Sequence, residues 1–185
     1  RLVGVGDIVP SAARHLVHAA TIATNTVITG TGARVGLITT QGFRDVLELG
    51  RLRYPKLYDM NWDKPAPLVP RHLRREVYER IDHRGEIVTP LDRESVDAAV
   101  EALLSFEVDS IAVCLLNAYA NPVHEEAVAE IVRRRTPTTQ LSISSDVLPE
   151  VKEFERTSTT VINACVRQVM ARYLGGIERR LAQKG

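Results

Sequence analysis

The sequence predicts an α/β fold in which crossover helices connect the strands of a parallel or mixed sheet. Its middle part alternates helix and strand patterns: an amphipathic helix after Asp92, an apolar strand at 110–116, a helix from Asn121-Pro122 and a strand at 140–144. A strand without polar alternation is typical of a sheet that is covered on both faces. Alternation of helices and strands favours the crossover connections of a parallel sheet.

The amino-terminal third predicts a helix, a strand and a short second helix. A stretch rich in Thr and Ala at 21–28 stops at Gly30, because glycine readily takes the left-handed conformation at a helix end. The β-branched run at 34–40 predicts a buried strand. A short helix at 45–49, closed by the glycine at position 50, follows it.

Residues 51–90 predict an insertion made of a long loop and a hairpin. Four prolines interrupt the pattern up to residue 70, and long ordered loops inside compact domains tend to carry function. A hairpin is expected at 76–88, with its turn at 82–85.

A long helix is predicted over 157–183, and we expect it to lead to another domain. Thr157 or Ser158 would cap it, and the Gly175-Gly176 pair should weaken or kink its last turns. Its expected apolar stripe is Ile162, Val166, Val169, Tyr173, Ile177 and Leu181. We treat residues 1–185 as one α/β region, and the opening on Arg1 without Met favours a piece of a longer protein.

The composition argues against several classes of function. A net charge of +1, with both signs interspersed, gives no electrostatic footprint for nucleic acid or an anionic membrane. There is no apolar run of about 18 residues, so no membrane span is expected. The two cysteines, Cys114 and Cys165, lie in apolar stretches, which favours small buried hydrophobes and a reducing, cytoplasmic location.

The histidines predict no metal site, because His15, His72, His83 and His124 lack ligand spacing with Cys or acidic partners. Of these four, His83 falls in the expected turn and His124 in the first turn of a helix. Both are therefore expected at the surface.

A first candidate cluster lies where a strand end meets a helix start, at His18, Thr21, Thr24 and Asn25. Free backbone N–H groups at such a junction suit an anion, and hydroxyl groups add hydrogen bonds to phosphate or a carbonyl. The alternative is that these threonines only cap the helix.

Two further clusters carry charge. Arg51 and Tyr58 belong to the proline-rich loop, where guanidinium groups could bind carboxylates or phosphates; the alternative is a solvated basic loop. Glu150, Glu155 and Arg156 precede the long helix. Acidic groups there are favourable for electrostatic reasons alone, and general-base or metal roles are the functional alternative.

Taken in order, these segments resemble one family. The run HAATIATN at 18–25 is similar to the His-Gly-Thr-Thr-Val-Ala-Thr-Asn motif of the hydantoinase A/5-oxoprolinase family. The resemblance continues over nearly the whole chain, through segments at 32–51, 57–59, 67–71, 79–86, 113–116, 119–125, 145–150 and 155–164. An ordered series of this length is far more specific than any one motif.

The resemblance implies an actin-like, sugar-kinase-like ATPase fold. Members of the family include ATP-dependent N-methylhydantoinases, 5-oxoprolinases and the smaller subunits of acetone-type carboxylases. Their shared chemistry is phosphorylation of an amide or carbonyl oxygen by ATP with Mg²⁺. For this chain it implies a small cyclic amide as substrate and a hydantoinase B-type partner subunit or domain.

The resemblance also assigns roles to residues. Thr21, Glu150, Glu155 and Arg156 are the expected catalytic residues, and no metal ligand is expected within the chain. The expected contacts to substrate or phosphate are His18, Thr24, Asn25, Arg51, Tyr58 and Asn163.

Two departures from the family pattern leave alternatives open. The Asp-Gly-Gly-Thr-x-Thr-Asp phosphate loop is absent, and Ala19 and Ala20 stand where the family has Gly and Thr. We expect a piece of an ATP-dependent cyclic-amide hydrolase that neither binds ATP tightly nor turns over alone. The alternatives are a degenerate structural or assembly domain of the family and the smaller subunit of an acetone-type carboxylase.

Overall fold

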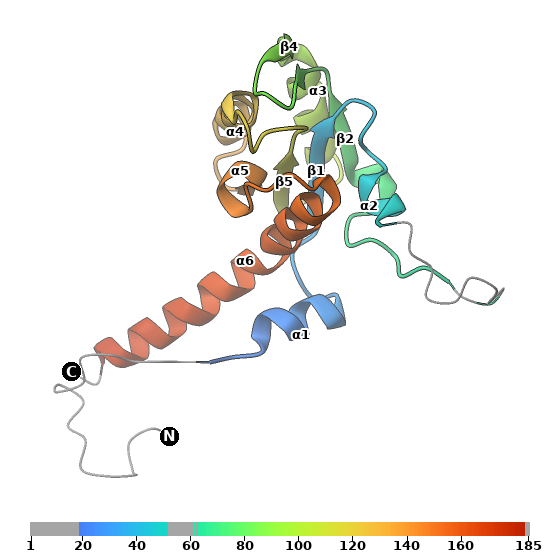
Figure 1. Cartoon of the computed structure of the whole chain (residues 1–185). Coiled ribbons are helices and arrows are strands. Elements are labelled where there is room, and N and C mark those ends of the chain that lie inside the picture. The colour runs from blue at the N-terminus through green and yellow to red at the C-terminus, as the bar shows by residue number, and fades with distance from the viewer. Residues whose placement is uncertain (1–18, 52–60, 62, 184–185) are drawn as a thin grey trace.

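A four-stranded parallel sheet forms the centre of the computed structural model, which describes residues 19–51, 61 and 63–183 (Figure 1). Every neighbouring pair of strands in this sheet is parallel. In spatial order the strands are β2 (Arg74–Val77), β1 (Val35–Thr40), β5 (Ser110–Cys114) and β6 (Gln140–Ile143). This arrangement confirms the predicted α/β class.

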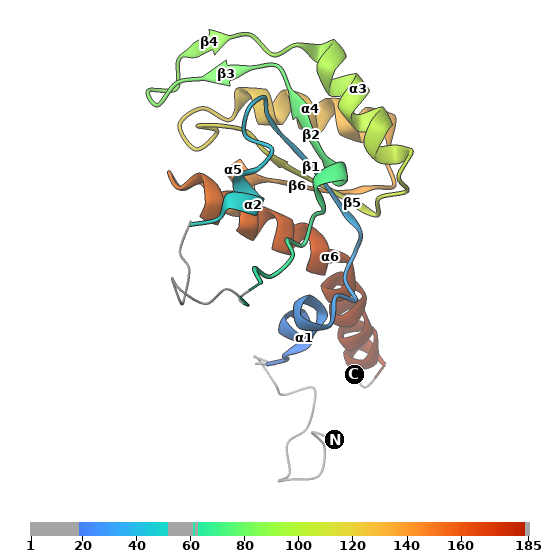
Figure 2. The ribbon, with the colours of Figure 1, turned by 90° about the vertical axis from the view of Figure 1, so that its right-hand side faces the viewer.

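Helices cover both faces of the sheet. On one face lie α3 (Arg93–Leu104) and α4 (Val123–Arg135), while α6 (Glu153–Ala182) crosses the other (Figure 2). Because both faces are covered, every residue of β1 and β5 is buried, as their apolar sequences predicted. The short helices α2 (Val46–Leu49) and α5 (Ser144–Val147) contact α6.

The helix α1 (Ile22–Thr29) packs against α6 before the chain enters the sheet. It ends at Gly30, whose φ of 64° is the left-handed conformation that the sequence predicted. The connection to β1 then runs close to α6, where Ala33 donates its backbone N–H to the carbonyl of Cys165 at 3.0 Å.

The expected hairpin at 76–88 is only partly correct. Its turn is confirmed, since Asp82 Oδ1 accepts hydrogen bonds from the backbone N–H groups of Arg84 and Glu86. The hairpin strands, however, are β3 (Arg80–Ile81) and β4 (Ile87–Thr89). Residues 76–77 belong to β2, which pairs with β1 in the main sheet after the 3-10 helix η2 (Arg71–Leu73).

The long helix also differs from its prediction. It begins at Glu153, about one turn early, has no side-chain N-cap, and continues through the two glycines to Ala182. The predicted apolar stripe is only partly correct, because Ile162 and Leu181 at its ends are exposed and the four residues between them are half-buried. Small and polar side chains instead form the buried face under the sheet: Thr157, Thr160, Val161, Ala164 and Cys165.

Both cysteines are buried and free, which confirms the expectation of small buried hydrophobes. None of the helices in the described part of the chain is long and apolar enough to span a membrane.

Candidate functional site

The strand order places a switch point between β1 and β5. From β1 the chain passes to β2 on one side, and from β5 it passes to β6 on the other. In open α/β sheets, ligands bind outside the carboxyl ends of the strands at such a point. The end of β1, the end of β5 and the first turns of α6 therefore form the candidate site.

Arg156 is the central charged group of this site and is only 1% exposed. It donates to the carbonyl of Leu115 at 2.7 Å and to that of Glu150 at 3.2 Å, and its Nε lies 3.5 Å from Sγ of Cys114. Its guanidinium carbon lies 5.5 Å from the centre of the Tyr119 ring. No carboxylate within the described ranges pairs with it. The hydrogen bonds of this buried guanidinium join α6 to the end of β5.

The thiol of Cys114 lies against this guanidinium. Burial raises the pKa of the Cys114 thiol, so the neutral form is favoured. Thr157 donates its hydroxyl to the same sulfur at 3.1 Å. The cavity that remains beside Arg156 has a volume of about 10 Å³, enough for about one water molecule.

Arg51 and Glu155 form an ion pair beside the start of α6. Arg51 Nε and Nη2 lie 2.6 and 2.5 Å from Oε1 of Glu155. The pKa of the Glu155 carboxyl lies below its ordinary value, first because its own backbone N–H donates to it and next because of Arg51. The predicted cluster of the proline-rich loop and the predicted cluster before the long helix therefore contact each other through this ion pair.

The predicted residues Glu150 and Asn163 make mainly structural contacts. Glu150 is exposed, and its backbone carbonyl rather than its carboxylate meets Arg156. Asn163 Oδ1 accepts a hydrogen bond of 2.8 Å from Ser142, which joins α6 to β6.

The helix-start cluster lies elsewhere on α6. Thr21 and Asn25 line an open depression of about 500 Å³ with Ala19, Ala20 and Tyr173. Tyr173 follows Glu155 by roughly 27 Å of helix at 1.5 Å per residue. The described residues of the expected site therefore lie at separate places along α6.

The hydroxyl of Thr21 makes no capping hydrogen bond to α1, so the capping alternative is not observed. Thr24 is exposed. His18 and Tyr58 lie outside the described residues.

A buried network that the sequence did not indicate lies under the ends of β1 and β5. Glu79 accepts a hydrogen bond from Thr40, and its other oxygen lies 2.8 Å from Nδ1 of His124. Thr40 in turn accepts the N–H of Leu116 at 2.8 Å. The expectation that His124 lies at the surface is wrong, because it is 5% exposed and packs with this carboxylate.

Glu125, the next residue, is fully buried and was also missed. It accepts hydrogen bonds from the N–H groups of Leu115 and Ser145 at 2.8 Å and from the Ser144 hydroxyl at 2.6 Å. Burial raises the pKa of its carboxyl, although these donors act against the shift. The available signal was an acidic residue in the first turn of the helix that follows a buried strand.

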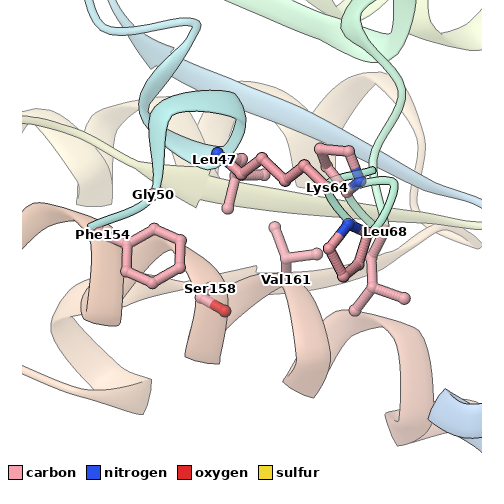
Figure 3. Close-up of a pocket in the computed structure, with 9 residues that line it drawn as sticks. Leu47, Gly50, Lys64, Leu68, Phe154, Ser158 and Val161 are labelled. Atoms are coloured by element: carbon pink, nitrogen blue, oxygen red, sulfur yellow. The ribbon is translucent and has the colours of Figure 1, made fainter. Parts of the chain in front are cut away.

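An apolar pocket of about 250 Å³ lies between α2, the segment 64–68 and α6 (Figure 3). In this pocket, called the α6 pocket below, Phe154, Ser158 and Val161 of α6 face Leu47 and Leu68. The other lining residues are Gly50, Lys64, Pro65 and Pro67.

The part of the chain that the structure describes contains no group of three His, Cys, Asp or Glu residues arranged to hold a metal ion.

The amino-acid sequence from residue 4 to residue 136 matches the family described as the Hydantoinase/oxoprolinase N-terminal region. The chain belongs to this family. It is 40% identical to an uncharacterized protein of Methanocaldococcus jannaschii, over 92% of this chain and 25% of that one.

Two characterised relatives share the fold. The chain is 35% identical to the caprolactamase subunit alpha of Pseudomonas jessenii, and the crystal structure of that ATP-dependent caprolactamase matches with a TM-score of 0.85. The match covers 91% of this chain and 25% of that one. A nucleotide-free acetone carboxylase structure matches at 29% identity with a TM-score of 0.80, over 89% of this chain and 25% of that one.

The chain thus spans about a quarter of these relatives. It is homologous to the N-terminal region of ATP-dependent cyclic-amide hydrolases and of acetone carboxylase subunits, as the sequence resemblance predicted.

Proposed function

We propose that this chain is part of an ATP-dependent enzyme that activates the amide or carbonyl oxygen of a small cyclic amide by phosphorylation. The observation that carries the proposal is the likeness to the ATP-dependent caprolactamase, at 35% identity and a TM-score of 0.85 over 91% of the chain. Phosphorylation turns a weak electrophile into a reactive one, and this chemistry depends on positioning and on charge stabilisation.

The start of α1 suits the phosphates of ATP. The first turn of a helix has backbone N–H groups without intrahelical partners, and here no side chain caps it. In the proposal Thr21, Thr24 and Asn25 contact phosphate together with His18. ATP supplies the phosphoryl group, and Mg²⁺ would neutralise its charge, with no ligand assigned to the described residues.

The start of α6 suits the other half of the reaction. Arg51 places a guanidinium group beside Glu155, and guanidinium groups stabilise the negative charge that develops on oxygen. Arg156 is buried and acts in the proposal by holding the backbone of Glu150 and the start of α6 in position. Tyr58 and Asn163 complete the proposed set. Since Arg51 and Glu155 lie at the start of α6, away from the start of α1, the proposal requires other parts of the complete polypeptide to bring phosphate and substrate together.

A partner subunit is part of the proposal. Several relatives are subunits by name, among them the caprolactamase subunit alpha and the acetophenone carboxylase gamma subunit. We infer that a hydantoinase B-type subunit or domain completes the hydrolysis after phosphorylation.

The test is phosphate release by the complete polypeptide with its partner. Hydantoin, 5-oxoproline, caprolactam and acetone with bicarbonate are supplied in turn with Mg-ATP. Release that depends on a cyclic amide supports the proposal. Phosphate release only in the sample with acetone and bicarbonate favours the carboxylase alternative, which the likeness to acetone carboxylase supports. No phosphate release with any of these compounds favours an assembly domain.

A second test uses the isolated 185-residue chain in a calorimetric titration with Mg-ATP. We expect no tight binding, because the phosphate loop of the family is not in this sequence. Micromolar affinity would contradict the division of the site that we propose.

A further inference from the structure

We propose that the α6 pocket binds the ring of a small cyclic amide and is the specificity-determining part of the substrate site. The identity of this ligand rests on the proposed function. The size of the pocket, its lining and its polar groups support the site independently.

Its size fits a single small ring. The volume of about 250 Å³ lies below the roughly 300–1,000 Å³ of sites for drug-sized ligands. A closed apolar cavity of about 150 Å³ is enough to hold benzene. A ring of about six or seven heavy atoms with one or two polar substituents therefore fits within the α6 pocket.

Its lining favours hydrocarbon. Most of the pocket wall is aliphatic or aromatic carbon: Leu47, Pro65, Pro67, Leu68, Phe154 and Val161. Methylene groups of a ligand would leave water on entering such a site, and this transfer is favourable. A hydantoin ring, which has few carbons and four polar groups, gains less from the same pocket.

Its polar groups can meet an amide. Lys64 also lines the pocket, and its Nζ donates to the backbone carbonyls of Glu48 and Leu49 at the end of α2, which leaves one of its three N–H donors for a ligand. Ser158 lines the α6 side, and its hydroxyl has no hydrogen-bond partner among the described residues. A hydroxyl can both donate and accept, so it can meet either the C=O or the N–H of an amide.

The pocket also adjoins the charged groups of the candidate site. The lining residues Gly50 and Phe154 are followed directly by Arg51 and Glu155, which form the ion pair. A ligand in the pocket would therefore lie beside Arg51, whose guanidinium is held in place by Glu155.

The experiment measures caprolactam binding to the complete polypeptide by calorimetry or ligand-observed NMR. Ser158→Phe and Leu68→Trp fill the pocket from opposite sides, and each should raise the Kd by at least about tenfold. Ser158→Ala should raise it by about fivefold, as expected for one lost hydrogen bond. The matched control is Thr159→Phe, which places the same side chain at the next, exposed position of α6 outside the pocket.

The outcomes are distinct. The inference is overturned if the wild type binds none of caprolactam, hydantoin or 5-oxoproline, or if Thr159→Phe weakens caprolactam binding as much as both filling variants. Unchanged melting temperatures identify the variants that remain folded, and Ser158→Ala tests the hydroxyl if both larger substitutions unfold. Caprolactam that binds in the α6 pocket but elicits no phosphate release would refute the proposed function and leave this inference standing.

Discussion

Nε of Arg51 donates a hydrogen bond of 2.6 Å to Oε1 of Glu155, which follows it by 104 residues. Arg51 comes directly after the glycine that closes α2, and Glu155 lies in the first turn of α6. The ion pair therefore fixes the start of the segment after α2 against α6, beside the α6 pocket. Two residues that the sequence assigned to separate clusters belong to one place in the fold.

Removing this ion pair should affect activity more than stability. Arg51 is half exposed, and exposed ion pairs contribute little to folding. We expect Arg51→Ala and Glu155→Ala to keep the wild-type melting temperature and to lower kcat/KM of the complete enzyme by at least about tenfold, because the guanidinium is placed to meet charge on the substrate. Steady-state phosphate release measures this change.

The matched control for this experiment is Arg135→Ala. It removes another surface ion pair of similar geometry, with Asp97 at 2.6 Å, on the opposite face of the sheet. Equal losses of activity in the two variants would show that the position of the Arg51 pair carries no special role.

The strands of the sheet could be predicted from the sequence where every residue of the strand is buried. The strands β1 and β5 are continuous apolar runs because helices cover both of their faces. By contrast, β2 has the sequence RREV, and Arg74 is fully buried there because it donates to Glu48 on α2 at 2.8 Å. A search for apolar residues cannot identify a strand in which a buried arginine is paired with a carboxylate from another element.

The contacts within the candidate site could not be predicted from the sequence. The buried face of α6 uses Thr157 and Thr160, whose hydroxyl groups bond to Cys114 and to the carbonyl of Arg156. An apolar stripe could not indicate this face. In the same way, the burial of His124 could not be predicted, because its partner Glu79 is 45 residues away in the sequence.

Gly32 should tolerate no larger side chain. A Cβ at this position would lie 2.2 Å from Sγ of Cys165 and 2.9 Å from its carbonyl oxygen. We expect Gly32→Ala to lower the free energy of unfolding by at least about 1–3 kcal/mol, because α6 or the connection to β1 must shift. Urea denaturation measures the change.

The matched control is Gly176→Ala, in the interior of α6 where a Cβ meets no atom within 4 Å. This substitution should raise the free energy of unfolding by about 0.5–1 kcal/mol, because alanine loses less entropy than glycine in a helix. Similar effects of the two substitutions would contradict the close packing of Gly32 on α6.

Glu125 should give the protein a stability term that weakens as pH rises. Burial raises the pKa of its carboxyl in the folded state, so the folded protein binds its proton more tightly than the unfolded chain does. The contribution is fully present below the unfolded pKa and is lost as pH rises through the raised folded pKa. Glu125→Gln should remove this pH dependence, measured by urea denaturation at several pH values.

Asp82 provides the control of opposite sign. Hydrogen bonds from the backbone N–H groups of Glu86 and then Arg84 hold the pKa of its carboxyl below the ordinary value. Its contribution is therefore present above the unfolded pKa and is lost as pH falls through the lowered folded pKa. A Glu125→Gln variant that keeps the wild-type slope would exclude Glu125 as the source of the term.

Arg156 should be essential for stability in addition to any role in catalysis. Arg156→Met leaves the carbonyl groups of Leu115 and Glu150 without this donor, and we expect a loss of about 2–4 kcal/mol in the free energy of unfolding. Arg156→Lys keeps the charge and should lose less. A stable Arg156→Met protein without activity would instead show that the guanidinium acts on substrate alone.

Ala19 and Ala20 should limit the use of ATP in the complete polypeptide. Both are exposed, precede the uncapped first turn of α1, and line the open depression with Thr21 and Asn25. Replacing them together by Gly and Thr adds a hydroxyl donor and lets the backbone approach phosphate more closely. We expect a roughly fivefold rise in phosphate release, the effect of about one hydrogen bond.

The matched control for that double substitution is Thr29→Ala at the other end of α1. It removes a hydroxyl that bonds only within the chain, to the carbonyl of Asn25 and to Thr31, far from the first turn. Phosphate release should not change in this variant. If the double substitution also leaves phosphate release unchanged, positions 19 and 20 do not contact phosphate. The difference from the family motif at these positions would then have no effect on activity.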